Sequence, residues 1–320
     1  MPASRLSLYI QATRPAFLSV SALGCFLGAA ITYANTGSVH LVAILIATLI
    51  AVIGQASANV INDIVDAVNG TDERNTSRIS PFTGGSRMIQ DQVLSLAQVR
   101  NLAIITVGLC ILAGALLLHL MRAWHLVWIG IVGLLIGWAY SAKPFTLMGR
   151  GVLGEVAIAA VWALIVIGTT LLETPLMSTS AWLLGLGYGL MVANILFANQ
   201  IPDIDADQSV GKMTLAVTTP AHQLWCWYAA MALSAYGLIL VAISINAVSV
   251  YALLGFIGLP ISTQAIKNLM GLAPNQIGNQ HSAHRQRMAA TIRQTILAAH
   301  LYGLGLAAGL LLGVRYLSPG

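Results

Sequence analysis

Charged residues are scarce in this chain of 320 residues: only 8% are Asp, Glu, Lys or Arg, whereas 58% are hydrophobic. A soluble domain usually carries about 25% charged residues, so the charged side chains here are too few to cover a water-facing surface. Apolar runs of about 20 residues, the length of a membrane-spanning helix, recur along the sequence. Short alternating strands of about 10 residues, the signal of a membrane β-barrel, are absent. The composition predicts an all-α protein embedded in the lipid bilayer, and we expect no nucleic-acid partner.

Cysteine is also rare and carries no recognisable motif. The three cysteines, Cys25, Cys110 and Cys226, are far apart and lie in apolar segments. No CxxC or Cys/His metal spacing is present, which argues against a thiolate metal centre or a disulfide framework. We interpret these residues as small hydrophobic side chains within helices.

Hydropathy predicts one transmembrane domain over residues 1–320, a bundle of nine helices around a central cavity. We expect cytoplasmic loops at about 63–100, 142–151, 201–223 and 267–293. The expected spans are 16–34, 41–62, 101–121, 124–141, 152–172, 180–200, 224–246, 248–266 and 294–314. A polar segment precedes the first span and no small-residue cleavage site follows it convincingly, so we expect a retained helix rather than a signal peptide.

Lysine and arginine predict the orientation, because cytoplasmic loops of membrane proteins are enriched in both. With the N-terminus in the cytoplasm, 13 of the 15 basic residues fall on the inner side. Only Arg122 and Arg315 fall on the outer side. We therefore expect a multi-pass protein of the inner cell membrane, with its N-terminus cytoplasmic and its C-terminus outside.

Acidic residues are the scarcest charged group, and they are concentrated. Six of the ten lie in two segments, NVINDIVDAVNGTD at 59–72 and ANQIPDIDAD at 198–207. In the predicted topology both segments emerge at the cytoplasmic face. Asn59, Asn62, Asp63 and Asp66 have the spacing of one helix face. The second set, Asn199, Asp203 and Asp207, shares a face too, whereas Asp205 should point elsewhere and Pro202 should kink the helix or start a new one.

Carboxylates crowded at the edge of a low-dielectric region repel one another unless a proton or a cation intervenes. Oxygen ligands without His or Cys suit Mg²⁺, which proteins usually hold with one or two carboxylates plus substrate phosphates. Two facing acid clusters therefore predict a Mg²⁺–diphosphate site. Basic residues that follow the polar motifs are candidates to neutralise the remaining phosphate charge. Each is also explained by the enrichment of Lys and Arg in cytoplasmic loops. These residues are Arg78, Arg87, Lys143, Arg150 and Lys212.

Four segments in this order resemble the UbiA superfamily of intramembrane aromatic prenyltransferases: TRPAFL, NVINDIVDAVNGTD, YSAKPFTLMGRGVLGE and NQIPDIDADQSVGKMTLAV. The first acid motif, with SPFTGGSR and RG-x-x-GE, is similar to the branch that includes 1,4-dihydroxy-2-naphthoate prenyltransferases of menaquinone synthesis. The resemblance implies Mg²⁺-dependent transfer of a polyprenyl group from a polyprenyl diphosphate to an aromatic acceptor.

The resemblance also implies roles for individual residues. Metal contacts would come from Asn59, Asp63, Asp66, Asn199, Asp203 and Asp207. The diphosphate would contact Lys143 and Lys212, with Arg78, Arg87 and Arg150 as further candidates, and Tyr140 would lie near the reacting prenyl carbon. Asp72 resembles the last acid of the first motif.

One departure concerns the acceptor. Naphthoate enzymes carry Asn-x-x-Arg-Asp in the second motif, whereas Pro202 precedes Asp203 here. Acceptors such as 4-hydroxybenzoate or homogentisate therefore stay open, and a membrane transporter is the alternative from another class, because intramembrane acids also mark ion pathways. Glu155 is a candidate general base, although carboxylates also favour helix N-termini without any catalytic role.

Overall fold

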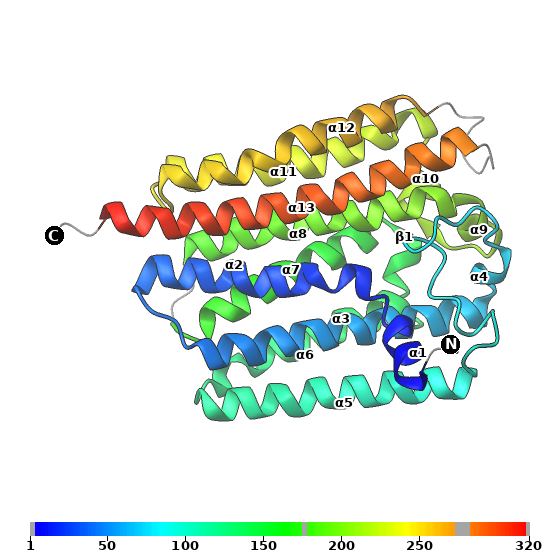
Figure 1. Cartoon of the computed structure of the whole chain (residues 1–320), viewed down its shortest axis with the longest axis horizontal. Coiled ribbons are helices and arrows are strands. Elements are labelled where there is room, and N and C mark those ends of the chain that lie inside the picture. The colour runs from blue at the N-terminus through cyan, green and yellow to red at the C-terminus, as the bar shows by residue number, and fades with distance from the viewer. Residues whose placement is uncertain (1–3, 175–177, 273–281, 318–320) are drawn as a thin grey trace.

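Nine long apolar helices run along one another in the computed structural model, which describes residues 4–174, 178–272 and 282–317. Within these ranges, the nine are long and apolar enough to cross a membrane. The chain begins near one end of the bundle and ends at the other (Figure 1), as an odd number of crossings requires. The predicted fold class is confirmed. Residues 273–281, part of the expected loop 267–293, lie outside the described residues.

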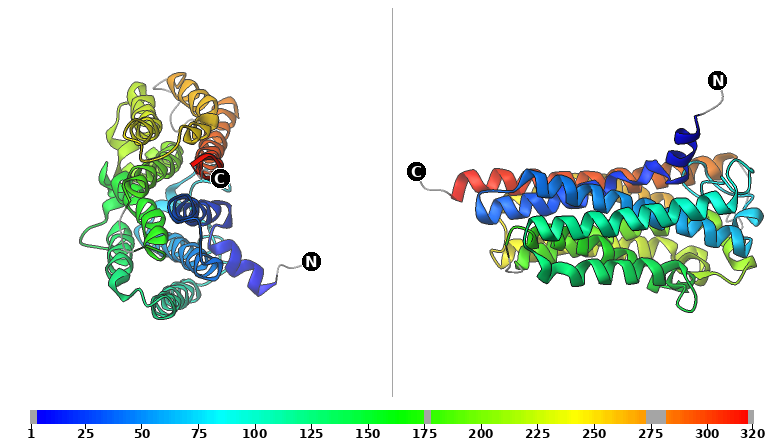
Figure 2. Two further views of the ribbon diagram at one scale, coloured as in Figure 1. Left: turned by 90° about the vertical axis from the view of Figure 1, so that its left-hand side faces the viewer. Right: turned by 90° about the horizontal axis from the view of Figure 1, so that it is seen from below.

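The helices follow the predicted order along the chain. A short amphipathic helix, α1 (Arg5–Ala12), precedes them and stands away from the bundle in the right view of Figure 2. The elements that form the spans are α2 (Ser19–Thr36), α3 (Leu41–Asn69), α5 (Leu96–Leu120), α6 (Val127–Ser141), α7 (Leu153–Leu171), α8 (Thr179–Gln200), α11 (Leu224–Ser244), the 3-10 helix η6 (Val250–Gly258) continued by α12 (Leu259–Met270), and α13 (Ser282–Leu317).

Helices α3 and α13 extend further than hydropathy predicts, and α13 begins at Ser282, inside the expected loop 267–293. Helix α3 continues to Asn69 instead of ending at 62, because the polar residues beyond the membrane contain no breaker before Gly70, whose φ is +81°. Helix α8 ends at Gln200, and a 3-10 turn, η4 (Ile201–Asp203), leads through Pro202 into α9 (Ile204–Ser209). Pro202 therefore starts a new turn, one of the two outcomes that its position allowed.

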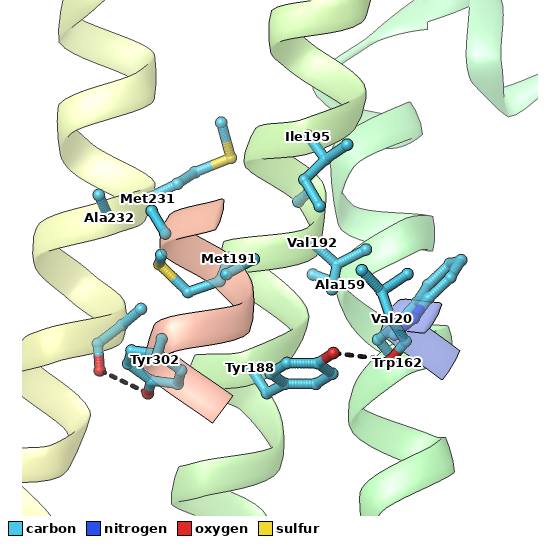
Figure 3. Packing of buried hydrophobic residues seen from close by; sticks show 14 of the residues in the cluster. Val20, Ala159, Trp162, Tyr188, Met191, Val192, Ile195, Met231, Ala232 and Tyr302 are labelled. Carbon is cyan, nitrogen blue, oxygen red and sulfur yellow. Dashed lines mark hydrogen bonds between the residues drawn. The ribbon is translucent and has the colours of Figure 1, made fainter. Parts of the chain in front are cut away.

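The core lies between α2, α7, α8, α11 and α13, and Figure 3 shows its central layer. Tyr188 and Tyr302 are fully buried there. Each hydroxyl donates to a backbone carbonyl of a neighbouring helix, at 2.6 Å from Val20 and 3.0 Å from Ala235 respectively. These bonds satisfy polar groups that would otherwise be costly in an apolar interior, and they tie α8 to α2 and α13 to α11.

The functional motifs gather at one end of the bundle. Figure 1 shows α4 (Thr71–Arg74), α9, α10 (Leu215–Thr218) and β1 (Arg150–Gly151) together at its right-hand end. There β1 pairs in parallel with β2 (Met213–Thr214), so that Arg150 faces Met213 and Gly151 faces Thr214. This short ladder joins the loop after α6 to the loop after α9.

Candidate active site

An ion-pair cluster joins the two acid motifs. The ammonium of Lys212 lies 3.1 Å from Asp66 Oδ1 and 3.4 Å from Asp207 Oδ1. Asn62, one turn before Asp66 on α3, donates to Asp66 Oδ2 at 2.8 Å. The end of α3 and the turn of α9 therefore converge on one cation, while Asp205 is exposed.

A loop of residues 75–90, here called the glycine loop, runs between the remaining carboxylates. The backbone N–H of Ser86 donates to Asp63 Oδ2 at 2.9 Å, and that of Gly84 donates to Asp203 Oδ2 at 3.3 Å. Asn75, at the start of the loop, donates its side-chain amide to Asp203 Oδ1 at 2.7 Å. One segment thus contacts an aspartate of each motif and spans the distance between them.

Only glycine fits the tip of this loop. Gly84 and Gly85 have φ values of +72° and +67°, a region that L side chains rarely adopt. A Cβ atom on Gly85 would stand 2.6 Å from Asp72 Oδ2 and 3.2 Å from Asp63 Oδ1. The missing side chain lets the backbone approach the carboxylates closely enough to donate to them.

Lys212 immediately precedes β2, and the pairing of β2 with β1 holds this part of the chain in place. The backbone N–H of Lys212 also donates to the carbonyl of Asp207 at 2.9 Å. Tyr140, near the end of α6, interacts electrostatically with Lys212. The end of α6 and the second acid motif therefore meet at this lysine.

The segment before α2 holds the glycine loop from the other side. Arg14 donates through Nη2 to the carbonyl of Phe82 at 2.8 Å, and its guanidinium carbon lies 5.3 Å from the centre of the Phe17 ring. Asn59, a predicted metal contact, donates its amide to the carbonyl of Thr13 at 2.9 Å. The segment before α2, the glycine loop and α3 are thus joined by hydrogen bonds.

The other predicted basic residues lie around this centre in different settings. Arg87 donates to the carbonyl of Asp72 at 2.7 Å and pairs with Asp91. Arg78 is half-buried beside Gly84. Lys143 is exposed, and exposed Arg150 donates to the carbonyl of Pro144 at 2.7 Å. The structure thus brings Lys212 into the carboxylate cluster and leaves Lys143 and Arg150 facing outward.

The electrostatics of the centre reflect crowding of like charges. Burial raises the pKa of Asp72 to about 7; the carboxylates of Asp66 and Asp63 add to this effect, and Lys212 and Arg14 oppose it. For Lys212, burial disfavours the ammonium form. The carboxylates of Asp66 and Asp207 outweigh burial and hold the pKa of Lys212 above its usual range.

Three buried side-chain oxygens of the centre are available to bind a hard cation. Asp63 Oδ1, Asn75 Oδ1 and Asn199 Oδ1 are buried and lack a hydrogen-bond partner among the described residues. All three are hard donors of the kind that Mg²⁺ prefers. Over the described ranges, no three His, Cys, Asp or Glu side chains converge tightly enough to enclose a metal alone. The donor set therefore fits a Mg²⁺ ion whose coordination a ligand completes, rather than a closed protein cage.

Sequence reasoning missed three residues of this centre: Asn75, Gly84 and Ser86. Gly84 and Ser86 donate their backbone N–H groups to carboxylates, and residue type gives no signal of a backbone donor. The Gly-Gly pair does indicate a turn, but nothing in the sequence states that this turn lies between two motifs separated by more than a hundred residues.

Comparison with known proteins agrees with this geometry. Residues 22–269 match the model of the UbiA prenyltransferase family. The 1,4-dihydroxy-2-naphthoate octaprenyltransferase of Haemophilus influenzae is 27% identical, over 68% of this chain and 71% of that protein. The enzyme of the same name from Bacillus subtilis is 25% identical, over 94% of this chain and 91% of that one.

Solved structures show the same fold. A digeranylgeranylglyceryl phosphate synthase has a TM-score of 0.61 at 15% identity, covering 96% of this chain and 98% of that one. A UbiA homolog from Archaeoglobus fulgidus bound to DMAPP and Mg²⁺ has a TM-score of 0.58 at 16% identity, covering 92% and 99% respectively. With its nine apolar helices and two acid motifs at one end, the chain belongs to the UbiA prenyltransferase family, whose members are membrane-embedded transferases.

Proposed function

We propose that this prenyltransferase moves a polyprenyl group from a polyprenyl diphosphate to 1,4-dihydroxy-2-naphthoate, giving a menaquinone precursor, and that it requires Mg²⁺. The observation that carries the proposal is the convergence of both acid motifs on Lys212 and the glycine loop. A site that must grip a diphosphate needs acceptor oxygens for the metal and a cation for phosphate, and both occur within this cluster.

Mg²⁺, when bound, neutralises the charge that develops on the diphosphate as it leaves. Asp63, Asp66, Asp203 and Asp207, with Asn59 and Asn199, would hold it. Lys212 would release its ion pairs to Asp66 and Asp207 and turn its ammonium toward the diphosphate, and Arg78 and Arg87 would contact phosphate oxygens from the glycine loop. Lys143 and Arg150, which are exposed in this structure, would have to turn inward to contact the diphosphate. Fixed charges of this kind stabilise a transition state without reorganising during the reaction.

Tyr140 would stand beside the reacting prenyl carbon. The electrostatic interaction between Tyr140 and Lys212 supports this role. Lys212 would contact the diphosphate at one end of the breaking C1–O bond, and Tyr140 would lie near the carbon at the other end. The apolar helices would exclude water, which would otherwise convert the prenyl cation into an alcohol. The polyprenyl tail would enter from the bilayer.

The naphthoate acceptor is proposed because two bacterial relatives, 25–27% identical to this chain, are 1,4-dihydroxy-2-naphthoate octaprenyltransferases. Pro202 is the departure from the naphthoate motif described above, so the assay below compares acceptors directly. We propose an inner-membrane location with the acid motifs facing the cytoplasm, because basic residues are concentrated on that side of the predicted topology.

The experiment is a transfer assay with protein purified in detergent. The protein would be incubated with one radiolabelled polyprenyl diphosphate, Mg²⁺ and, separately, 1,4-dihydroxy-2-naphthoate, 4-hydroxybenzoate or homogentisate, and the products would be identified by mass. We expect a prenylated, decarboxylated product with the naphthoate. Product with another acceptor alone would overturn the acceptor assignment, and no product with any aromatic acceptor would overturn the proposed reaction.

A further inference from the structure

Glu155 is a buried carboxylate next to the site that the proposed chemistry has not used. It lies in the first turn of α7 and is 2% exposed. Its Oε1 accepts a hydrogen bond of 2.8 Å from Gln200 Nε2. The other end of Gln200 is fixed as well, because its Oε1 accepts from the backbone N–H of Ala216 at 3.3 Å. The position of the carboxylate is thus set by α8 and α10.

The second oxygen of Glu155 is different. Oε2 is buried and has no hydrogen-bond partner among the described residues. Leaving such an atom unsatisfied is costly, and nearly all buried polar atoms in native proteins have a partner. A carboxylate whose only task was to join α7 to α8 would need one oxygen, so the free oxygen indicates a partner that arrives with a substrate.

The location of Glu155 connects it to the reacting centre. Tyr140, near the end of α6, is in electrostatic contact with both Lys212 and Glu155. Gln200, which holds Glu155, directly follows Asn199, whose Oδ1 is itself buried and unpartnered. Glu155 therefore adjoins the cluster but belongs to neither acid motif.

We propose that Glu155 is the catalytic base, and that its Oε2 accepts the hydroxyl proton of the aromatic acceptor while Gln200 positions it. This inference rests on the proposed function. When the hydroxyl proton moves to Oε2, the ring gains electron density and its carbon bonds to prenyl C1. The C1–O bond breaks, and its electron pair leaves with the diphosphate. The ring then releases H⁺ or, where the attacked carbon carries a carboxylate, CO₂, and the acceptor oxygen recovers the proton from Glu155.

The groups that face Glu155 make its own titration identifiable. Tyr140 of α6 is in electrostatic contact with Glu155, and also with Lys212, Asp66 and Asp207 of the cluster. Helices α8 and α10 contribute Gln200 and the Ala216 backbone, which do not titrate. A pH effect that disappears with the Glu155 carboxylate alone therefore belongs to Glu155.

The test uses Glu155→Gln, which keeps an oxygen for Gln200 but cannot take a proton. The matched control is Glu173→Gln, which changes a glutamate whose partner is His40, at the opposite end of the bundle. For Glu155→Gln we expect kcat to fall by at least about 100-fold, the usual size of a general-base contribution. The KM for prenyl diphosphate should stay within about twofold of wild type, and the acidic limb of the pH–kcat profile should vanish. Glu155→Asp should keep that limb with intermediate activity.

Two further measurements separate catalysis from folding. Thermal unfolding and binding of a prenyl thiodiphosphate, both with Mg²⁺, should be close to wild type for Glu155→Gln. A ring-halogenated acceptor with a more acidic hydroxyl should recover much of the lost kcat, because it needs less help to ionise. A kcat within threefold of wild type, or an equal loss with every acceptor and an unchanged pH profile, would overturn the base. If wild-type protein transfers to no acceptor, the proposed function and this inference fall together.

Discussion

Lys212 and Asp66, 146 residues apart in sequence, form an ion pair of 3.1 Å between Nζ and Oδ1. The same ammonium lies 3.4 Å from Asp207 Oδ1. Both carboxylates are nearly buried, at 7% and 4% side-chain exposure, so they depend on this cation for neutralisation. Lys212 therefore couples the two acid motifs electrostatically, because one ammonium pairs with a carboxylate of each.

Replacing Lys212 with Met should destabilise the metal-free protein. Removing one partner of a buried pair leaves an uncompensated charge and costs about 3 kcal/mol. Added Mg²⁺ would supply the missing positive charge, so the increase in Tm on adding Mg²⁺ should be larger than in wild type. Thermal unfolding in detergent with EDTA and then with Mg²⁺ measures both effects. Lys267→Met, at an exposed lysine, is the control, and an equal Mg²⁺ response in both variants would contradict the prediction.

Asp63→Ala and Asp203→Ala should each reduce transfer by at least about 100-fold, since groups that stabilise developing charge contribute factors of this size. Both proteins should still be inserted and folded. Asp205→Asn changes an exposed acid of the same motif and should keep most of the activity. Initial rates with saturating Mg²⁺, beside size-exclusion profiles in detergent, check this. Retained turnover in both alanine variants would remove these aspartates from the site.

Gly85→Ala should impair transfer far more than its backbone strain explains. The new Cβ would meet Asp72 Oδ2 at 2.6 Å and Asp63 Oδ1 at 3.2 Å, which would push the glycine loop off the carboxylates. Gly37→Ala is a matched control: its φ is +76°, close to the +67° of Gly85, but nothing lies within 4 Å of its Cβ. Both substitutions carry about 1 kcal/mol of left-handed strain, so similar activities would show that strain alone matters.

The stability of the metal-free protein should depend on Asp72. Its pKa rises from 3.8 to about 7 on folding, so the folded chain binds a proton more tightly than the unfolded chain does. The free energy of unfolding should therefore decrease as pH rises from about 4 to about 7, by about 1.4 kcal/mol per pKa unit at most. Asp72→Asn should flatten this slope. Denaturant titrations with EDTA at pH 5, 6, 7 and 8 check the sign, and an unchanged slope in the variant would refute it.

Chelation should stop the reaction reversibly. EDTA would withdraw the ion that the unpartnered oxygens of Asp63, Asn75 and Asn199 suit, and excess Mg²⁺ should restore the initial rate. Because Lys212 and the backbone amides hold the carboxylates without metal, circular dichroism should show no loss of helix during the treatment. Turnover that persists in EDTA would exclude a metal requirement.

Much of this architecture follows from hydropathy and spacing. The nine spans and their order were predictable because each is a long apolar run, and the parity of the crossings places both acid motifs at the same end of the bundle. The extension of α3 to Asn69 was not predictable from hydropathy. A hydropathy profile marks the end of the apolar run, whereas the helix continues through the polar residues that follow it. Pro202 left two outcomes open, and only packing decides between a kink and a new turn.

Within the site, side-chain chemistry was more readable than backbone chemistry. Lys212 was expected near the diphosphate from its position after the second motif, and it does lie in the carboxylate cluster. Lys143 and Arg150 matched the same reasoning, yet both are exposed. The two glycine-loop amides could not be foreseen, since their partners are set by tertiary contacts across the whole bundle.

Both of those amide contacts come from the main chain of the glycine loop. Gly84 and Ser86 each offer a main-chain N–H, one to Asp203 and one to Asp63. The Ser86 hydroxyl also interacts with Asp63, so removing it would weaken one contact to that carboxylate. Inserting or deleting one residue between the two backbone donors would put one amide out of register. The length of this segment, together with the glycines at its tip, sets the gap across which a pyrophosphate would fit.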